Sequence, residues 1–306
     1  MKEISVLAPA TVSNVVCGFD CLGFALEAPC DEMTVRLIDE KAVKIINHDR
    51  YNLPTDAKKN VAGVALLAML AEIEDETGFE VEITKRIKPG SGIGSSAASA
   101  VGAVAAANRL LENRFSQAQL AEFAMSGEFV ASQSRHADNV APCLFGGFVL
   151  VRSSNPLDIV ALEFPALFAT VIHPQIEIKT SYAREILPEN VPLKDAIRQW
   201  SNLGALVAAL SKGDYALISR SLEDFLIEPV RKSLIPRFDD LKSESLKAGA
   251  LGGGISGSGP SVFMLSENLE TARKAETAMR EIYEQTTIDF NVYVSEINAD
   301  GVKFVQ

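Results

Sequence analysis

The sequence predicts an α+β fold that is divided into two domains. A chain of 306 residues suits two packed domains of roughly 100 to 200 residues each. Strand-like and helix-like segments do not follow strict β-α-β alternation, which favours α+β layers over a doubly wound sheet. The polar stretch RSSNPLD, residues 152–158, combines Ser, Asn and Pro and is the best candidate for a boundary. We therefore expect an N-terminal domain of residues 1–155 and a C-terminal domain of residues 156–306.

Strands and helices are both indicated in the first half of the chain. Runs rich in β-branched residues predict strands at residues 4–7, 34–38 and 81–84. Good helix formers predict a helix over residues 62–73 and a second, made mostly of alanine, over residues 95–111. An alanine-rich helix can pack very closely against its neighbours.

Two further elements complete the predicted first domain. Ser116 followed by Gln119 fits a capping box, which predicts a helix from this point to about Met125. The run FGGFVLV, residues 145–151, predicts a strand that is opened by glycine.

The second half repeats the mixed pattern. It predicts strands at residues 169–172, 262–265 and 292–297, and helices at residues 195–210, 214–226 and 270–284.

Charge restricts the kind of ligand site that the chain can build. The formal net charge is −11, so the overall field repels both nucleic acid and nucleotide phosphates. A phosphate site must then be built locally, from backbone N–H groups, a helix N-terminus, a metal ion and a few arginines. We expect no nucleic-acid partner.

The N-terminus and the cysteines indicate a reduced cytoplasmic protein. The start, MKEISVLAPA, lacks the basic residues and long apolar core of a secretory signal. The most apolar stretch, residues 97–107, is shorter than the roughly 20 residues that cross a bilayer, so we expect no membrane span. Four cysteines without CxxC spacing give neither a disulfide scaffold nor a zinc pattern.

The most informative segment is the glycine-serine loop PGSGIGSSAAS, residues 89–99, which runs into the alanine-rich helix. Its three alternating glycines allow a close approach of the backbone to a ligand and positive φ angles where these are needed. Ser95 and Ser96 fall at the helix start, where free N–H groups and the helix dipole attract phosphate. No Gly-Lys pair occurs in the chain, which excludes a Walker A loop. The alternative is a flexible turn before a core helix.

A second glycine-rich segment matches a dinucleotide motif only formally. Gly252, Gly254 and Gly257 fit GxGxxG. However, a helix-like segment precedes them and the strand-like SVFML follows, whereas the Rossmann motif runs from strand through loop to helix. We reject the NAD-binding interpretation on this context.

Three segments together resemble the three motifs of the GHMP kinases, the galactokinase, homoserine, mevalonate and phosphomevalonate kinase superfamily. They are PATVSNVVCGFDCLG (9–23), GSGIGSSAAS (90–99) and GGGISGSGPS (252–261), and the resemblance covers essentially the full chain. It implies an N-terminal, ribosomal-protein-S5-like domain that binds ATP and a C-terminal, ferredoxin-like α/β sandwich domain. It also implies transfer of phosphate from ATP, with Mg²⁺, to the hydroxyl of a small molecule.

Within the superfamily, the chain resembles the homoserine kinase family. The discriminating features are Asn14, Asp20, the segment 126–142, Arg184 in KTSYAREILP and Arg231 in LIEPVR. This resemblance implies transfer of the γ-phosphate of ATP to L-homoserine, in threonine biosynthesis, by a homodimer. A mevalonate-type kinase, or a non-catalytic relative that uses the fold for binding, stays open as an alternative.

An amino-acid substrate agrees with the charged residues in these segments. Such a substrate needs donors for its carboxylate and acceptors for its ammonium group. Arg184 and Arg231 would hold the carboxylate, and Asp20 and Asp138 would face the ammonium group and the reacting hydroxyl. Asn14 and His136 would add hydrogen bonds, and the resemblance also implies substrate contacts for Thr180 and Gly257. Taken alone, each of these residues could instead cap a turn, form a surface ion pair or lie in the core.

The resemblance also implies a catalytic set, Asp138, Asn139 and Asp20. Mevalonate kinases pair an aspartate with a lysine, but the matching stretch here is HADN, with Asn139 in place of the aspartate. Asp138 would accept the hydroxyl proton, or the reaction would run without a dedicated base.

The expected nucleotide and metal contacts follow from the same resemblance. Mg²⁺ would be held by Ser96 and Glu128, and the third motif, residues 252–259, would close over the site with its N–H groups towards substrate or phosphate. The adenine should lie near Asn60 and Val61. The full set of expected nucleotide contacts is Asn60, Pro89, Gly90, Ser91, Gly92, Ile93, Gly94, Ser95, Ser96, Ala97, Ala98 and Ser99.

Overall fold

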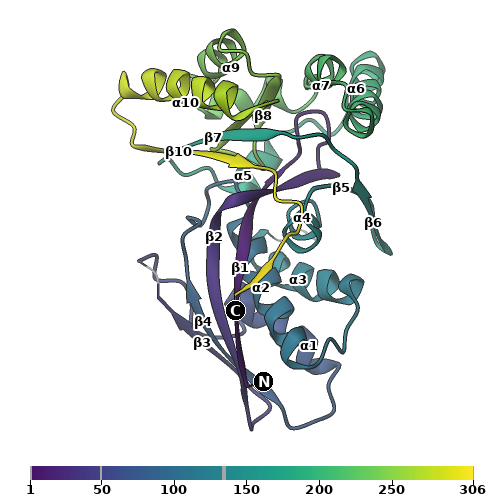
Figure 1. Cartoon of the computed structure of the whole chain (residues 1–306), viewed down its shortest axis with the longest axis vertical. Helices are drawn as coiled ribbons and strands as arrows, with labels where there is room; N and C mark the ends of the chain where they lie inside the picture. The colour runs from purple at the N-terminus through teal and green to yellow at the C-terminus, as the bar shows by residue number, and fades with distance from the viewer. Residues whose placement is uncertain (1, 49, 133–135, 306) are drawn as a thin grey trace.

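Two sheets of unequal size, one mostly and one wholly antiparallel, form the framework of the molecule (Figure 1). The structure is a computed structural model, and it describes residues 2–48, 50–132 and 136–305. Strands β1 and β2 run along the lower part of the view, and the second sheet lies across their upper end. The predicted α+β class is confirmed.

The larger sheet has seven strands. Its main path is β11-β1-β2-β4-β3, with β5 paired to β2 and β6 paired to β5. All of these pairs are antiparallel except β3 with β4. The strands are β1 (Glu3–Ser13), β2 (Leu22–Ile38), β3 (Val43–Asn47), β4 (Gly78–Thr84), β5 (Phe148–Ser154), β6 (Leu157–Leu162) and β11 (Lys303–Val305).

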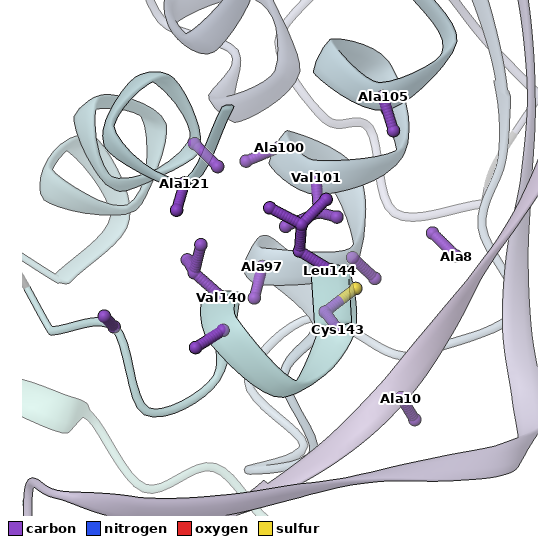
Figure 2. Packing of buried hydrophobic residues seen from close by; sticks show 14 of the residues in the cluster. Ala8, Ala10, Ala97, Ala100, Val101, Ala105, Ala121, Val140, Cys143 and Leu144 are labelled. Carbon is purple, nitrogen blue, oxygen red and sulfur yellow. The ribbon is translucent and has the colours of Figure 1, made fainter. Parts of the chain in front are cut away.

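Four helices accompany this sheet: α1 (Val61–Ala71), α2 (Ser95–Leu110), α3 (Gln117–Ser132) and α4 (Val140–Phe145). Helix α2 packs on β1 and β2, and α1, α3 and α4 contact α2. Figure 2 shows alanines of α2 beside Ala8 and Ala10 of β1, with Val140, Cys143 and Leu144 of α4 on another side. Because small side chains allow this close approach, 14 of the 16 residues of α2 are buried.

The smaller sheet has the order β10-β7-β9-β8, and all its pairs are antiparallel. Its strands are β7 (Phe168–Pro174), β8 (Gly252–Ile255), β9 (Val262–Ser266) and β10 (Phe290–Glu296). Helix α10 (Leu269–Glu284) contacts β7, β9 and β10, and α9 (Phe238–Lys247) packs beside it (Figure 1). The other helical segments are α5 (Thr180–Glu185), α6 (Leu193–Lys212), α7 (Tyr215–Ser221), α8 (Glu228–Arg231) and the 3₁₀ turn Lys232–Leu234.

Most predicted elements are present. The capping box is confirmed: the Gln119 N–H donates to Ser116 Oγ (3.4 Å), and the Ser116 N–H donates to Gln119 Oε1 (3.0 Å). No helix in the described residues is long and apolar enough to cross a bilayer.

The single helix predicted over residues 214–226 is wrong. Helix α7 ends at Ser221, and α8 begins at Glu228. Between them, the Asp224 carboxylate accepts hydrogen bonds from the N–H groups of Leu226 and Ile227 at 2.9 and 3.0 Å. A side chain that satisfies backbone donors in this way competes with a continuous helix.

The predictions for residues 145–151 and for the third motif also need correction. Phe145 is the last residue of α4, and the strand begins only at Phe148, after two glycines with positive φ. In the third motif, for which no strand was predicted, Gly252–Ile255 forms strand β8, because its backbone pairs with β9.

The polar stretch at residues 152–158 is the turn of the β5–β6 hairpin. Strand β6 still pairs within the larger sheet, and the chain enters the smaller sheet only after residue 162. It returns at the end, where β11 pairs with β1. The division at residues 155 and 156 therefore stays a proposal about domains, and the pairing places the first crossing between sheets at residues 163–167.

Candidate active site

A cavity of about 340 Å³ lies where the two sheets meet. Residues from the larger-sheet half form most of its wall, and residues of α5, α8 and the turn after β8 close it from the other half. The predicted site residues that line it are Asn14, Asp20, Asn60, Pro89, Gly90, Ser91, Gly92, Gly94, Ser95, Ser96, Ser99, Glu128, His136, Asp138, Asn139, Thr180, Arg184, Arg231 and Gly257. Three named nucleotide contacts, Ile93, Ala97 and Ala98, instead bury their side chains in the core.

The glycine-serine loop needs its glycines for backbone conformation. Gly90, Gly92 and Gly94 have φ of +72°, +80° and +69°. A Cβ on Gly94 would lie 2.0 Å from Thr11 Oγ1, and a Cβ on Gly92 would lie 2.7 Å from the Gly259 carbonyl oxygen. Both conformation and close packing therefore require glycine at positions 92 and 94.

The loop has a row of amides without acceptors among the residues that the structure describes. The first hydrogen bond of α2 runs from the Ala98 N–H to the Gly94 carbonyl (2.9 Å), so the N–H groups of residues 95–97 precede it. Within the described part of the chain, the N–H groups of residues 92–94 also meet no backbone or side-chain acceptor. Together with the dipole of a 16-residue helix, these amides form a site for an anion.

Lys85 and Asp31 form a buried ion pair beneath the start of α2, and the sequence analysis missed it. Lys85 Nζ donates to the Asp31 carboxylate, to the Ser95 carbonyl (2.8 Å) and to Ser99 Oγ (2.9 Å). The other Asp31 oxygen accepts from the N–H groups of Arg86 and Ile87. No local pattern marks this pair, because 54 residues separate its members.

Glu128 and Ser96 lie together at the metal position expected from the sequence. Glu128 is buried; this raises the pKa of its carboxyl, although the hydrogen bond to Ser96 and the charge of Lys85 act in the opposite direction. A carboxylate and a hydroxyl are the hard oxygen donors that Mg²⁺ prefers, and phosphates and water usually complete its shell. These two residues therefore fit a magnesium ion that is shared with a polyphosphate.

Two arginines, from α5 and α8, line the cavity on the side of the smaller-sheet half. Arg184 makes a two-fold contact with Asp20, from Nη2 to Oδ1 (2.8 Å) and from Nη1 to Oδ2 (3.0 Å). Arg231 is 3% exposed and donates only to the carbonyls of Ala183 (2.8 Å) and Gly257 (3.4 Å) among described residues. Burial, together with the charge of Arg184, lowers the pKa of Arg231 to about 10. A buried cation without a carboxylate partner favours the binding of an anion.

Phe19 is a second residue that the sequence analysis missed. Its ring lies 5.5 Å from the Arg184 guanidinium carbon and 5.1 Å from that of Arg231. The ring therefore contacts both cations by cation–π interaction. Its position directly before Asp20 in the first motif is the signal that could have found it.

Asp138 and Asn139 are held by strand β1. Thr11 Oγ1 donates to Asn139 Oδ1 (2.7 Å), and Asn139 Nδ2 donates to Ser13 Oγ (2.9 Å). Ser13 is in turn hydrogen-bonded to the Asp138 carboxylate. Burial, and then the charge of Asp20, raise the pKa of Asp138 to about 6. A carboxylate of this kind can accept a proton near neutral pH.

The remaining predicted residues contact other residues that line the cavity. Asn14 Nδ2 donates to the Gly257 carbonyl (2.6 Å), and Asn14 Oδ1 accepts from the Asp20 N–H (3.0 Å). His136 Nδ1 lies 3.9 Å from Asp20 Oδ1. Thr180 Oγ1 lies 3.3 Å from Ser258 Oγ, and both residues line the cavity. Residues 133–135 of the segment 126–142 lie outside the described residues.

The third motif differs from expectation in its contacts. The Gly257 N–H donates to the Ser13 carbonyl (3.2 Å), and the Gly259 N–H donates to the Ser256 carbonyl (2.9 Å). These two amides are therefore engaged within the protein rather than turned towards the cavity.

The wall of the cavity beside the start of α1 carries several apolar residues. Leu53, Pro54, Val61 and Ile83 line it. Asn60 caps helix α1: its Oδ1 accepts from the N–H of Ala62 at 2.9 Å.

Comparisons with known proteins agree across the whole chain. Residues 59–147 match the GHMP kinases N-terminal domain, and residues 184–285 match the GHMP kinases C-terminal domain. A homoserine kinase of Chlorobium phaeobacteroides is 45% identical, with 99% of each chain covered. The crystal structure of homoserine kinase from Cytophaga hutchinsonii has a TM-score of 0.96 and 52% identity, covering 100% of this chain and 98% of that one. A mevalonate kinase of L. major, at 14% identity and a TM-score of 0.73, shares the fold.

Proposed function

The chain belongs to the GHMP kinase family, and on that premise we propose that it is a homoserine kinase. It transfers the γ-phosphate of ATP to the side-chain hydroxyl of L-homoserine, which gives O-phospho-L-homoserine and ADP. One observation supports this most directly. A single cavity joins a row of amides at a helix start to two arginines and two carboxylates, the groups that a polyphosphate and an amino acid require.

The phosphates of ATP bind the loop of residues 90–96 in this proposal. The N–H groups of residues 92–94 have no acceptor in the described chain, and the dipole of α2 adds positive potential. Ser96 and Glu128 hold Mg²⁺, which neutralises charge on the phosphates when it is bound. The apolar residues around Val61 take the adenine.

The amino-acid part of the substrate binds at the opposite end. Arg231 and Arg184 hold its carboxylate, and Asp20 takes its ammonium group. Because Asp20 and Arg184 pair with each other in the free site, a zwitterion can replace one internal ion pair by two new ones. A ligand with only a carboxylate would leave Asp20 unpaired, and a ligand with only an ammonium group would leave Arg184 unpaired. This arrangement therefore favours amino acids.

Asp138 orients the reacting hydroxyl and accepts its proton. Its carboxylate lies beside Asn139 and is held by Ser13, so it is fixed relative to the start of α2. Phosphoryl transfer needs mainly alignment of the attacking and leaving oxygens and stabilisation of negative charge. The protein groups named here provide both.

A coupled ADP-release assay tests the function, with homoserine, mevalonate and galactose compared side by side, each with and without Mg²⁺. We expect turnover with homoserine, and only when Mg²⁺ is present. Turnover with mevalonate alone would assign a mevalonate-type kinase instead. ATP binding without turnover on any of the three would indicate a non-catalytic relative.

The proposal also covers the cellular location, the pathway and the number of subunits. We expect a cytoplasmic enzyme of threonine biosynthesis that works as a homodimer and has neither nucleic acid nor membrane as a partner. Growth of a threonine auxotroph that lacks homoserine kinase would support the pathway. Light scattering after gel filtration would give the number of subunits.

A further inference from the structure

Two serines of the third motif lie behind the phosphate loop rather than in the cavity. Ser256 and Ser261 are fully buried, each at 0% exposure. Ser261 Oγ donates to the Ser91 carbonyl (2.6 Å), and Ser256 Oγ donates to the Gly92 carbonyl (2.7 Å). Neither serine lines the cavity. Both hydrogen bonds join the smaller-sheet half to the loop that precedes α2, across more than 160 residues of sequence.

These hydrogen bonds determine which way the loop amides point. In a planar trans peptide, the C=O of one residue and the N–H of the next lie on opposite sides of the chain. The peptides that follow Ser91 and Gly92 are not among the cis bonds of the described chain. When Ser261 holds the Ser91 carbonyl, the Gly92 N–H must therefore face away from the third motif. The Ser256 contact does the same for the N–H of Ile93.

The next peptide is held in the same way by the larger sheet. The Thr11 N–H of strand β1 donates to the Ile93 carbonyl (3.2 Å), which turns the Gly94 N–H to the opposite side. Three consecutive carbonyls are thus bonded to the scaffold, and the three amides that follow them have no acceptor in the described chain. The same loop has a further unused donor or acceptor, the buried Ser91 hydroxyl, which has no hydrogen-bond partner in the described ranges of the chain.

A loop with glycine at positions 90, 92 and 94 has no side-chain preference that would fix its peptide planes. Glycine adopts backbone conformations that other residues avoid, so a glycine-rich loop loses more conformational entropy when it is fixed in one conformation. Two buried hydroxyls at short distance can supply the missing restraint. Because they are built into the β8–β9 hairpin, the restraint comes from the other half of the molecule.

We propose that Ser256 and Ser261 are positioning residues that set the Gly92 and Ile93 amides in advance for the phosphates of the nucleotide. The inference rests on the proposed function, since it takes this loop to be the phosphate site. It assigns to the third motif a role behind the loop, in which side-chain hydroxyls rather than backbone amides act. The effect on catalysis passes through nucleotide binding, so it differs from that of residues that contact homoserine.

The experiment compares Ser256→Ala, Ser261→Ala and the double variant with Ser266→Ala. Ser266 is the matched control, because it lies in β9, is also 0% exposed, and its hydroxyl has no hydrogen-bond partner among the residues described. The binding of ADP and of adenosine is measured directly by calorimetry, alongside the KM values for MgATP and homoserine. Adenosine lacks phosphates, so its affinity reports on the nucleoside end alone.

Each single alanine variant should weaken ADP binding and raise the KM for MgATP by about fivefold to tenfold, the effect of losing one buried hydrogen bond. The double variant should show a larger change. In these variants, adenosine affinity and the KM for homoserine should stay within about threefold of the wild-type values, because neither ligand contacts the phosphate loop. Ser266→Ala should match the wild type, because the Ser266 hydroxyl does not hold the loop. Cysteine at position 256 or 261 keeps a weak donor of similar size, so Ser256→Cys and Ser261→Cys should recover part of the ADP affinity. The cysteine variant also replaces an alanine variant that does not fold.

Two results would overturn the proposal. One is a double variant whose ADP affinity equals that of the wild type. The other is an equal loss for ADP and adenosine, which would indicate general loosening rather than reorientation of the amides. The measurements of ADP and adenosine binding do not depend on turnover. If the wild type releases no ADP with homoserine, the proposed function fails, while the ratio of ADP to adenosine affinity still decides the role of the serines.

Discussion

Replacing Asp138 by Asn should make the enzyme slower and, at alkaline pH, the fold more stable. The substitution keeps the size of the side chain and removes its charge. Asp138 is 4% exposed, and its pKa is raised from 3.8 to about 6, first by burial and then by the negative charge of Asp20. The charge of His136 and the hydrogen bond from Ser13 act in the opposite direction.

The stability change follows from this shift. The pKa in the folded state lies about 2 units above the unfolded value, and each unit corresponds to about 1.4 kcal/mol, so the ionised carboxylate costs the fold up to about 3 kcal/mol. Because the folded pKa is the higher one, this cost is absent below about pH 4 and is complete above about pH 6. Asp138→Asn should therefore raise the free energy of unfolding by about 1 to 3 kcal/mol at pH 8, and give no such gain at pH 4.

The activity change has the opposite sign. If the ionised carboxylate orients the hydroxyl and accepts its proton, kcat/KM of the wild type should rise with pH through a midpoint near 6, the pKa of the free enzyme. The variant should lose this pH dependence, and its kcat at pH 8 should fall by more than about tenfold. Urea unfolding at the two pH values and the ADP-release assay between pH 5 and pH 8 measure both effects.

The control is the same Asp→Asn substitution at an exposed position, which shows how much of the effect comes from the location of Asp138. Asp75 is exposed and pairs with Arg114 at 3.3 Å, so Asp75→Asn should change stability by less than about 0.5 kcal/mol and leave kcat unaltered. Unaltered kcat at pH 8 in Asp138→Asn would refute the assigned role. A variant that is less stable than the wild type at pH 8 would refute the electrostatic argument.

Four further substitutions test other parts of the site. Arg231→Met should raise the KM for homoserine by about 100-fold or more with little change in the KM for MgATP, because it removes charge-assisted hydrogen bonds to the carboxylate; steady-state kinetics with each substrate varied measure this. Glu128→Gln should lower kcat and raise the Mg²⁺ concentration needed for half-maximal rate, as a Mg²⁺ titration would show. Gly94→Ala should lower the Tm and weaken ADP binding, because φ is +69° and the new Cβ would lie 2.0 Å from Thr11 Oγ1. Lys85→Met should destabilise the fold by about 3 to 5 kcal/mol in urea unfolding, since it leaves the Asp31 charge buried and unpaired; a much smaller loss would mean that Asp31 becomes neutral instead.

Local sequence was sufficient for the elements that carry a strong periodic or capping signal. The alanine-rich run predicted α2 with its first residue at Ser95, and the Ser116–Gln119 capping box predicted the start of α3. It was not sufficient at Asp224, where one side chain captures the backbone N–H groups that would otherwise continue a helix. It also missed β8, because a run of glycines forms a strand only when β9 lies beside it.

The motifs placed most of the candidate site in one cavity, yet they did not predict how its residues are connected. Asp20 and Arg184 were each assigned to the substrate, and in the folded chain they bind each other. Phe19 beside both arginines and Lys85 beneath the loop carry no periodic signal. They depend on residues that are distant in sequence.

The sequence by itself determined that this acidic chain has an α+β fold, that a glycine-serine loop, the proposed phosphate site, runs into a helix start, and which family it resembles. These properties are local, since they follow from residue types at fixed spacing along one segment. Only the tertiary structure decided the direction of the loop amides, the buried charge of Arg231 and the raised pKa of Asp138. Each of these depends on burial and on partners that the fold brings together from distant parts of the chain.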